Sequence, residues 1–455
     1  MQIHGNGILN LPLDNNGRTK QHICDFIIDG SREFVVGIDD FPIETTEELV
    51  YGNNVLHVDY LLCVDENNEK FTLYDCIIIP LQCPKTREVK VIWKRYLLGY
   101  HIINEENEKI CCAEYVVQTD GKKYPFHMFV GRTDFDVLNG NVHISTDWHT
   151  EMSKIDGVKI SVTTEKPLSI SNIEKVVLRL IEIYSLQTGF FPRIQKRKMA
   201  TEDNKEFYYW EEFASYGKTA IGNIRLEYAL GVEKEQDYSC VYEKWWNLRE
   251  KEVTTFNLFS YITTDDSPIM EVPVATCIQC LEGYFRIHHT EDLFKFSESV
   301  KKQIKKEIKQ MFEDSSSLKI ICEENRIDFG GIKDSLFRSI GYINEYSLKE
   351  ILIYAIEQCD MTKKLFEYER ITKVDEKKNL LDVFLNKSAG HRNWLSHLVE
   401  QKNKFVNEEI TLATKKLKLL FRLTLLNDIG VEISESSLDR VINNINKWYK
   451  NNNLI

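Results

Sequence analysis

The first part of the chain, up to about residue 165, consists of short runs in which apolar and polar residues alternate. A period of two is the pattern of a half-buried β-strand, and it is clearest at residues 158–163. Asp-Gly and Asn-Gly pairs, which tolerate the positive φ angles of tight hairpin turns, recur in this part. The pairs are Asp29-Gly30, Asp120-Gly121, Asn139-Gly140 and Asp156-Gly157. The pattern predicts an antiparallel, β-rich domain of the sandwich or barrel kind, with one hairpin around Asn139-Gly140.

A single helix is predicted after these strands. Ser171 followed by Glu174 is a capping-box signature, an apolar stripe follows it, and Gly189 is a suitable stop. Another strand is predicted at residues 207–210. The charged stretch at residues 233–237 is the best candidate for a domain boundary. We therefore divide the chain into a β-rich domain, residues 1–235, and a helical domain, residues 236–455.

From about residue 242 the apolar period changes from two to that of a helix. Ser347 and Glu350 form a capping-box pattern at the start of one of these helices. We predict helices over residues 242–261, 272–288, 296–312, 375–386, 391–404, 406–427 and 437–451, with a short connector at 388–390. The helix at 406–427 is apolar on more than one side, which is typical of the middle of a bundle or of a subunit contact. The fold class is therefore α+β, with a β-rich domain before an all-α bundle.

Composition and charge narrow the class of protein. A chain of 455 residues normally forms two domains, and its net charge of −12 argues against a general nucleic-acid coat. Any RNA contact must therefore be local. The 11 cysteines are mostly scattered singly, as in a reduced cytosolic protein. The first residues show no signal-peptide pattern, and no uncharged apolar run is long enough to span a membrane. We expect a cytoplasmic protein without membrane association.

The candidate chemistry lies in one short run, residues 390–397. Arg392 is a permanent cation whose forked donors suit a phosphate group, and His397 can move a proton near neutral pH. Asn393 and His397 are spaced i,i+4 and share a helix face, whereas Arg392 and His397 are about 140° apart on a helix. One helix therefore does not bring Arg392 and His397 side by side. Two copies that face each other across a two-fold axis would do so.

The run from Arg392 to His397 resembles the R-x4-6-H motif of the HEPN superfamily, in its R-N-x-x-x-H form. The chain as a whole resembles the ApeA-like proteins of bacterial antiphage defence, which carry a β-rich domain before a helical HEPN domain. The segment Leu281-Glu282-Gly283-Tyr284 is similar to the acidic position early in the ApeA-like helical domain. Glu282 is therefore a candidate supporting residue that orients Arg392 or His397. The alternative is an ordinary surface pair between Glu282 and Arg286.

The resemblance implies an endoribonuclease that needs no metal ion and no cofactor. In such an enzyme the 2′-hydroxyl of the RNA attacks the neighbouring phosphate, His397 moves a proton, Arg392 stabilises the phosphate and Asn393 orients His397 or the substrate. The resemblance also implies a homodimer with a composite site, a phage-derived trigger and abortive infection. His391 lies outside the motif spacing and is expected to be dispensable. The rival hypothesis is a non-catalytic binding or regulatory module, because one fold hosts both kinds of function.

Two further groups are candidates for binding. Cys277 and Cys280 form a C-x-x-C pair, but no second pair of ligands completes a zinc site, so we interpret them as buried small residues. Residues 193–198 form a basic cluster with Arg193, Lys196, Arg197 and Lys198. This cluster is a candidate contact for RNA or for a phage protein, and a solvated strand or loop is the simpler interpretation.

Overall fold

The protein is described by a computed structural model of the chain. The structure describes residues 3–12, 19–28, 33–37, 56–64, 69–81, 88–93, 95–99, 101–102, 108–118, 131–137, 140–151, 154–189, 191–192, 194–203, 205–211, 229–231, 238–251, 253–264, 271–289, 296–341, 345–370, 380–398 and 401–451. The predicted pairs Asp29-Gly30 and Asp120-Gly121 lie outside these residues.

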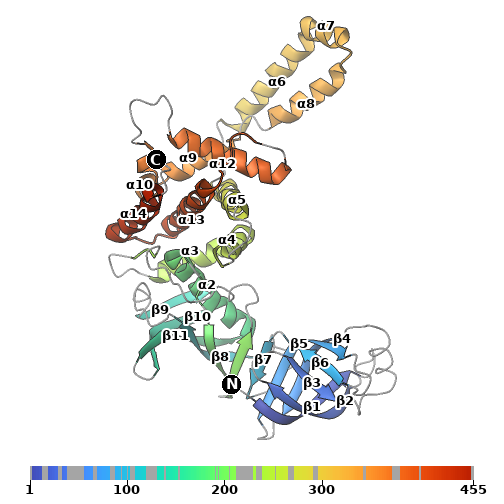
Figure 1. Cartoon of the computed structure of the whole chain (residues 1–455), viewed down its shortest axis with the longest axis vertical. Helices are drawn as coiled ribbons and strands as arrows, with labels where there is room; N and C mark the ends of the chain where they lie inside the picture. The colour runs from blue at the N-terminus through green and yellow to red at the C-terminus, as the bar shows by residue number, and fades with distance from the viewer. Residues whose placement is uncertain are drawn as a thin grey trace. The chain divides into compact units, whose positions relative to one another are not determined.

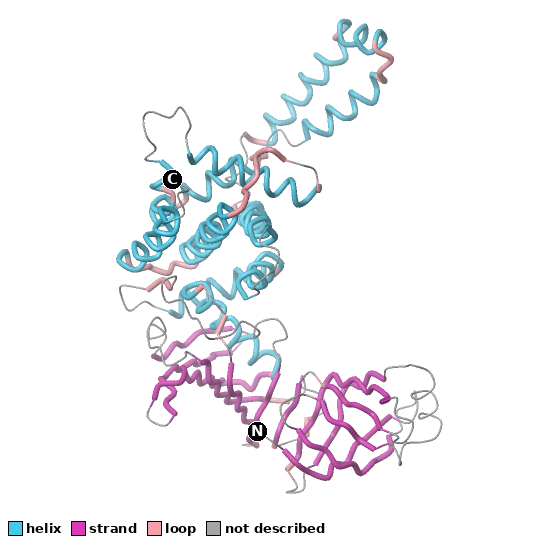
Figure 2. Tube along the Cα trace, in the orientation of Figure 1, coloured by secondary structure: helices cyan, strands magenta, loops and turns pink. Residues whose placement is uncertain are grey.

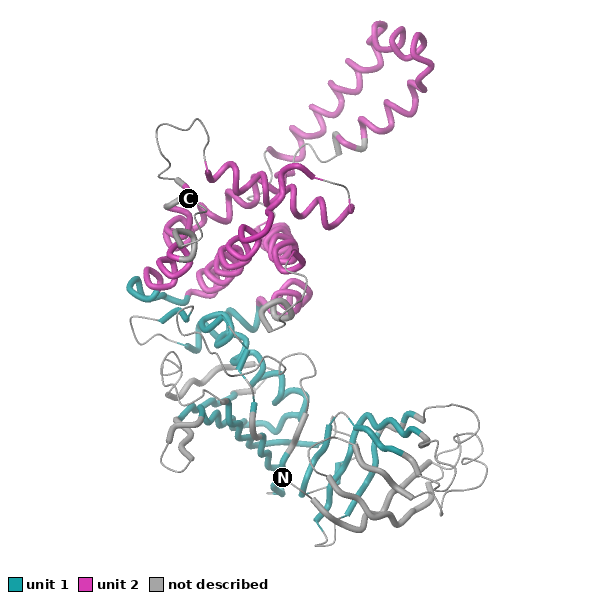
Figure 3. Tube along the Cα trace, in the orientation of Figure 1, with its two compact units in different colours: residues 1–247, 263–265, 431–437 teal, residues 248–262, 266–430, 438–455 magenta. Residues whose placement is uncertain are grey.

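The chain forms two compact units (Figure 3). Unit 1 comprises Met1–Asn247, Thr263–Asp265 and Val431–Ser437, and unit 2 comprises Leu248–Ile262, Asp266–Gly430 and Leu438–Ile455. Strands dominate unit 1 and helices form unit 2 (Figure 2). The α+β class is therefore confirmed, with an antiparallel β-sheet in the N-terminal part and a helical C-terminal region.

The sheets of unit 1 are antiparallel throughout the described residues. The strands are β1 (Ile3–Pro12), β2 (Thr19–Ile28), β3 (Glu33–Gly37), β4 (Leu56–Val64), β5 (Lys70–Leu81), β6 (Glu88–Ile92), β7 (Arg95–Leu98), β8 (Ile110–Gln118), β9 (Gly131–Val137), β10 (Gly140–Glu151), β11 (Lys154–Leu168), β12 (Ile194–Thr201) and β13 (Glu206–Glu211). Strands β1 and β2 pair with each other. The other described strands form one sheet in the order β3-β6-β5-β7-β13-β12-β8-β11-β10-β9, with β4 paired to β5.

Two of the Gly-containing pairs have different roles. Gly140 pairs with Val137 where β9 and β10 meet, so the hairpin expected around Asn139-Gly140 is confirmed. Asp156 and Gly157 instead lie inside β11, and the prediction of a turn there is wrong. A Cβ atom on Gly157 would lie 2.4 Å from the backbone oxygen of Val117 on β8. Glycine is needed at this position because two strands approach closely, not because the chain turns.

Helix α2 (Ile170–Thr188) covers part of the sheet, against β8 and β11. Its cap is Ser169, whose side chain accepts a hydrogen bond from the Asn172 N–H, so the predicted cap at Ser171 is wrong by two residues. The stop at Gly189 is confirmed, since that residue has a φ of 80°. The phenol of Tyr115 on β8 donates a 2.7 Å hydrogen bond to Glu174, which joins the helix to the sheet.

The first ten residues of helix α3 (Tyr238–Lys251) belong to unit 1. Tyr242 donates to the backbone oxygen of Val176, and the Trp245 indole donates to Glu182, which also pairs with Arg179 at 2.9 Å. All of these side chains are buried. The start of α3 therefore completes the core of unit 1, and the boundary proposed after residue 235 precedes this helix.

The described helices of unit 2 form a bundle with one projecting part (Figure 1). They are α4 (Thr254–Thr264), α5 (Glu271–His288), α6 (Glu298–Asp314), α7 (Ser316–Glu324), α8 (Phe329–Gly341), α9 (Leu348–Glu357), α10 (Asp360–Leu365), α11 (Glu367–Arg370), α12 (Leu380–His397), α13 (Glu408–Asp428) and α14 (Glu435–Asn451). The capping box of Ser347 and Glu350 is confirmed at the start of α9. No helix in the described part of the chain is both long enough and apolar enough to cross a membrane.

Helix α13 occupies the middle of the bundle. Its buried residues lie on several sides, and among them are Leu417, Leu420 and Phe421, which are fully buried. Phe259 of α4 and Tyr284 of α5 both contact the Phe421 ring. The apolar sides of this helix are therefore covered by the chain's own helices. The prediction that this helix lies in the middle of a bundle is confirmed. The alternative prediction, a contact between subunits, gains no support from these contacts.

An ion pair is buried against α13. Lys416 is fully buried and its ammonium group contacts the carboxylate of Glu369 on α11, which is also buried. Burial lowers the pKa of Lys416, and the attraction of Glu369 opposes that shift. The two charges hold each other in a region that water does not reach.

Helices α6, α7 and α8, residues 298–341, form a projection that we call the helical arm. Phe312 of α6 stacks on Phe329 of α8 with ring centroids 5.0 Å apart, so the two long helices pack on each other. The helix predicted at residues 296–312 is confirmed as α6. Of its apolar residues, only Phe312 is buried. Other apolar side chains of the arm remain exposed, for example Met311 at 71 %.

Candidate active site

Helix α12 carries the Arg392–His397 run and is continuous from Leu380 to His397. The expected connector at residues 388–390 is therefore wrong, and the run lies at the end of a helix and not at its start. Gly390 is needed because the segment after the helix folds back across it. A Cβ atom on Gly390 would lie 1.6 Å from the backbone oxygen of Asn403. The glycine thus reflects a close backbone approach within a helix.

His391 is a core residue. Its side chain is fully buried, its Nε2 atom donates to the backbone oxygen of Glu271 at 3.1 Å, and its ring contacts Trp394 and Phe405. Burial lowers the pKa of His391, because the charged imidazolium loses its hydration, and the hydrogen bond to Glu271 offsets only part of that effect. His391 therefore anchors α12 to the start of α5 and to the returning segment. The expectation that His391 is dispensable concerns activity, and its burial gives it a structural role besides.

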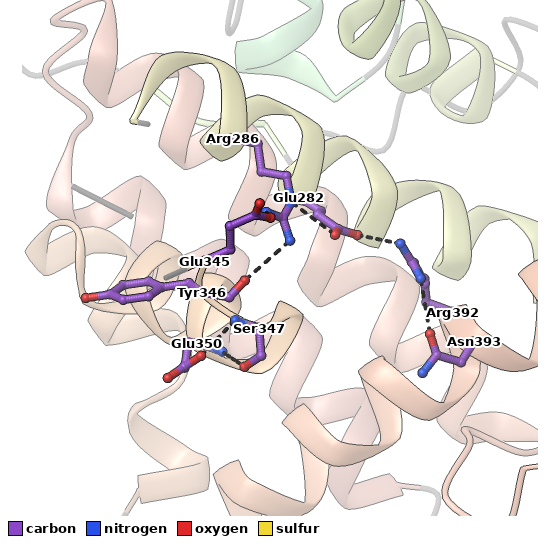
Figure 4. A network of polar contacts seen from close by, with 8 residues as sticks. All are labelled: Glu282, Arg286, Glu345, Tyr346, Ser347, Glu350, Arg392 and Asn393. Carbon is purple, nitrogen blue, oxygen red and sulfur yellow. Dashed lines mark hydrogen bonds and ion pairs between the residues drawn. The ribbon is translucent and has the colours of Figure 1, made fainter. Parts of the chain in front are cut away.

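Arg392 is held by an acid from a neighbouring helix (Figure 4). One terminal nitrogen of its guanidinium donates to Glu282 Oε2 at 3.0 Å, and the other donates to Asn393 Oδ1 at 3.1 Å. The side chain of Arg392 is 29 % exposed and that of Glu282 is 14 % exposed. Glu282 and Arg392 lie 110 residues apart in the sequence, and the packing of α5 against α12 brings them into contact. The structure thus brings together Arg392, Asn393 and Glu282.

Glu282 also contacts a second arginine. Its Oε1 atom accepts a hydrogen bond from Arg286 at 3.2 Å, which is the i,i+4 pair that was the alternative interpretation. Arg286 in turn donates to Glu345 at 3.1 Å and to the backbone oxygen of Tyr346. Figure 4 shows this chain of contacts from Glu345 through Arg286 and Glu282 to Arg392. Both contacts of Glu282 therefore occur at once, since the carboxylate bridges two guanidinium groups.

His397 is the last residue of α12 and is exposed. Leu398 follows it with a φ of 53° and an exposure of 81 %, so the chain leaves the helix in the left-handed region at this point. Within the described residues, no hydrogen bond or ion pair joins His397 to Arg392. Because α12 is continuous through both residues, their i,i+5 spacing places the two side chains about 140° apart around the helix, as expected.

A polar cluster on α5 was not expected from the sequence. Asp428, the last residue of α13, accepts hydrogen bonds from Tyr284 at 2.5 Å and from Gln358 at 2.8 Å, and it lies 3.4 Å from His289 Nε2. Burial and the nearby carboxylate raise the pKa of Tyr284 far above its usual range. His289 directly follows α5, and its ring nitrogen faces Asp428. The cluster forms where three segments distant in the sequence meet, so the sequence alone does not show it.

The other candidate groups are part of the fold. Cys277 and Cys280 are buried free thiols, Cys280 donates to the backbone oxygen of Thr255, and burial raises the pKa of Cys277 to about 12. They are buried small residues, as interpreted. No group of three or more potential metal ligands occurs within the described ranges.

The basic cluster at residues 193–198 lies mostly in strand β12. Arg197 is buried there and lies 3.6 Å from Glu174, and Lys198 pairs with Glu206 at 2.6 Å. Arg193 lies outside the described residues. The described part of this cluster is therefore tied into the sheet and its covering helix, so it is not a free basic surface.

Together, these observations define an α+β chain whose helical bundle presents an acid-held arginine and an exposed histidine at the end of one helix. Residues 276–435, about a third of the chain, match the sequence model of the Apea-like HEPN family. These residues of the helical region are thus similar to an Apea-like HEPN domain, the family that the motif and the acidic position resemble. Searches of curated proteins and of solved structures found no match to the chain.

Proposed function

We propose that this protein is an antiphage endoribonuclease that cleaves RNA at Arg392 and His397 without a metal ion. The observation that carries the proposal is the contact between Glu282 and Arg392, in a domain that matches the Apea-like HEPN family. A neighbouring helix fixes the arginine of the motif, while the histidine of the same motif stays exposed to a substrate.

In the proposed reaction the 2′-hydroxyl of one nucleotide attacks the adjacent phosphorus atom. The bond from phosphorus to the 5′-oxygen breaks, which leaves a 2′,3′-cyclic phosphate and a free 5′-hydroxyl. His397 takes up the proton of the 2′-hydroxyl or donates one to the leaving oxygen. Arg392 stabilises the negative charge that grows on the phosphate oxygens. Asn393 accepts a hydrogen bond from Arg392 and so helps to orient the guanidinium.

The proposed enzyme is a homodimer with a composite site. Arg392 and His397 are five residues apart on one continuous helix, so a two-fold partner is needed to bring an arginine and a histidine to the same phosphate. The β-rich residues 1–235 are proposed to sense a phage-derived trigger, because the candidate catalytic groups all lie in the helical domain. Cleavage of host RNA after that signal would stop the infected cell, which is abortive infection.

One observation favours the rival function, a non-catalytic binding module. The guanidinium of Arg392 already contacts a carboxylate, so a phosphate must compete with Glu282 or share the arginine with it. Guanidinium carries five N–H donors, and the two contacts of Arg392 use only part of them. Sharing is therefore chemically possible, and the catalytic proposal predicts it.

The test is cleavage of RNA by the purified protein, with the phage trigger supplied by extract from infected cells. RNA is incubated with the protein in buffer with and without EDTA, and the ends of the fragments are identified. Cyclic phosphate ends that form equally in EDTA support the proposal. Cleavage that disappears in EDTA and returns with Mg²⁺ would contradict the mechanism, and no cleavage at all under inducing conditions would favour the binding module.

A further inference from the structure

Helix α6 of the arm carries a concentration of positive charge on an acidic chain. Five lysines lie within nine residues: Lys301, Lys302, Lys305, Lys306 and Lys309. The chain as a whole carries a net charge of −12. A local basic surface on an acidic protein is the arrangement that binds a polyanion at one place without coating it elsewhere.

The lysines share one side of the helix. With about 100° per residue, the five positions fall within an arc of about 140°. Glu307, the one acid between Lys301 and Lys309, lies outside this arc on the other side of the helix. Phe312 of the apolar stripe stacks on Phe329 of α8, and Ile304 and Ile308 of the same stripe are half-buried. Packing of the arm therefore turns the lysine side towards solvent.

The side chains on this side are accessible. Lys302, Lys306 and Lys309 are exposed, and Lys305 is half-buried. Lys301 pairs with Glu298 at 3.1 Å, so it is the member of the row that is already neutralised. Residues 301–309 span about 12 Å along the helix axis, a length that suits contact with several successive phosphates of a single strand.

The arm is joined to the candidate active site at its base. Helix α5, which carries Glu282 and Arg286, precedes the arm, and Glu345 and Tyr346 follow it. Arg286 binds both Glu345 and the backbone of Tyr346, and the same arginine contacts Glu282, the partner of Arg392. Arg286, which precedes the arm in the sequence, and residues 345–346, which follow it, therefore contact each other one step away from Arg392 (Figure 4).

From this placement we propose that the lysine side of α6 binds the phosphate backbone of the RNA that reaches Arg392 and His397. The inference rests on the proposed function for the identity of the polyanion. Binding is independent of base sequence, because ammonium groups contact phosphates and not base edges. The arm thus gives the enzyme its affinity for single-stranded RNA, and the motif residues supply the chemistry.

The test measures binding separately from cleavage. The probe is a fluorescent single-stranded RNA of about 20 nucleotides, a length that exceeds typical site sizes for single strands. It is titrated with the full chain carrying His397→Ala, at several salt concentrations. The test variant adds Lys302→Glu, Lys306→Glu and Lys309→Glu. The control instead adds Lys244→Glu, Lys251→Glu and Lys447→Glu, which change the net charge equally at exposed positions outside the arm.

The α6 variant is expected to bind the RNA at least tenfold more weakly at low salt. The slope of log affinity against log salt concentration should also be smaller in magnitude by about 2, because each of the three lost phosphate contacts contributes about 0.7. The control is expected to keep the salt dependence of its parent. Two outcomes overturn the inference. In the first, the α6 variant and the control bind RNA with equal affinity and equal salt dependence. In the second, the α6 variant binds RNA as its parent does but loses a protein contact such as the dimer. RNA that is bound through α6 but not cleaved by the unmodified protein supports the inference while the proposed function fails.

Discussion

Glu282 accepts hydrogen bonds from two arginines at once: Arg286 on its own helix at 3.2 Å, and Arg392 on α12 at 3.0 Å. The carboxylate therefore sits between two cations, and each of its oxygens serves a different one. This division holds Arg392 in one place, because the other end of the same acid is fixed by Arg286 and, through it, by Glu345. The relationship makes Glu282 a positioning residue for the proposed reaction.

Substitution of Glu282 by Ala should lower the rate of RNA cleavage by about 10- to 100-fold, since misplacement of a catalytic group by about 1 Å has effects of this size. The loss should fall on kcat and not on KM, because removal of a negative charge beside Arg392 does not weaken its attraction for phosphate. Glu282→Gln keeps one acceptor oxygen and should fall in between. Kinetics at saturating RNA measure this split. An increase in KM with unchanged kcat would argue against a positioning role.

Arg392→Ala and His397→Ala should each abolish detectable cleavage, with a loss of about 10²–10⁴ in rate for the proton-transfer group. Arg392→Lys should also fail, because an ammonium group lacks the fork that contacts both a carboxylate and a phosphate. The control is Asn386→Ala, an exposed position on the same helix. His391 is unsuitable for this purpose because it is fully buried. Full cleavage by His397→Ala would remove the basis of the proposed mechanism.

Gly390→Ala should destabilise the helical domain, because the added Cβ would meet the backbone of Asn403 at 1.6 Å and the chain must shift. Overpacking of this kind typically costs about 1–3 kcal/mol. The matched control is Gly283→Ala in α5, where the Cβ would lie 3.4 Å from the Thr255 hydroxyl, an ordinary contact. That change should be neutral or stabilising by up to about 1 kcal/mol, because Ala favours a helix. Thermal unfolding distinguishes the two, and equal midpoints would show that residues 401–405 do not cross α12 as described.

Stability of the helical domain should fall as the pH drops below about 6.5, the usual pKa of histidine. Burial lowers the pKa of His391 in the folded protein, so the unfolded chain binds more protons between the two pKa values. The contribution of His391 is therefore fully present above pH 6.5 and is lost as the pH falls towards its folded pKa. His391→Gln cannot titrate and should show a smaller decrease in melting temperature from pH 7.5 to 5.5. Equal decreases in both proteins would show that His391 does not titrate differently on folding.

Features that depend on neighbours in the sequence were predicted well. The hairpin at Asn139-Gly140, the stop at Gly189 and the capping box at Ser347 all follow from the conformational preferences of a few adjacent residues. The sequence pattern predicts a cap at Ser171 where the structure has Ser169, because two serines near the same helix start offer the same local signal. Local patterns thus locate an element more reliably than its exact first residue.

Features that depend on distant residues were not predictable in the same way. The local pattern predicts a turn at Gly157 and a connector at Gly390, whereas each glycine allows a separate backbone segment to approach closely. The motif spacing identified Arg392, Asn393 and His397, and a family resemblance pointed to Glu282. The bridge from Arg286 to Glu345 was not predicted, because it depends on where the arm rejoins the bundle.

The buried pair of Lys416 and Glu369 restricts the routes by which the core of this protein can evolve. Loss of either partner leaves a lone charge away from water, at a cost of about 3–5 kcal/mol, whereas replacement of both by apolar residues of similar size is often neutral or better. An apolar core at this place is thus separated from the present one by an unstable intermediate. We therefore expect the two positions to change together, or one of them only after compensation elsewhere in the domain.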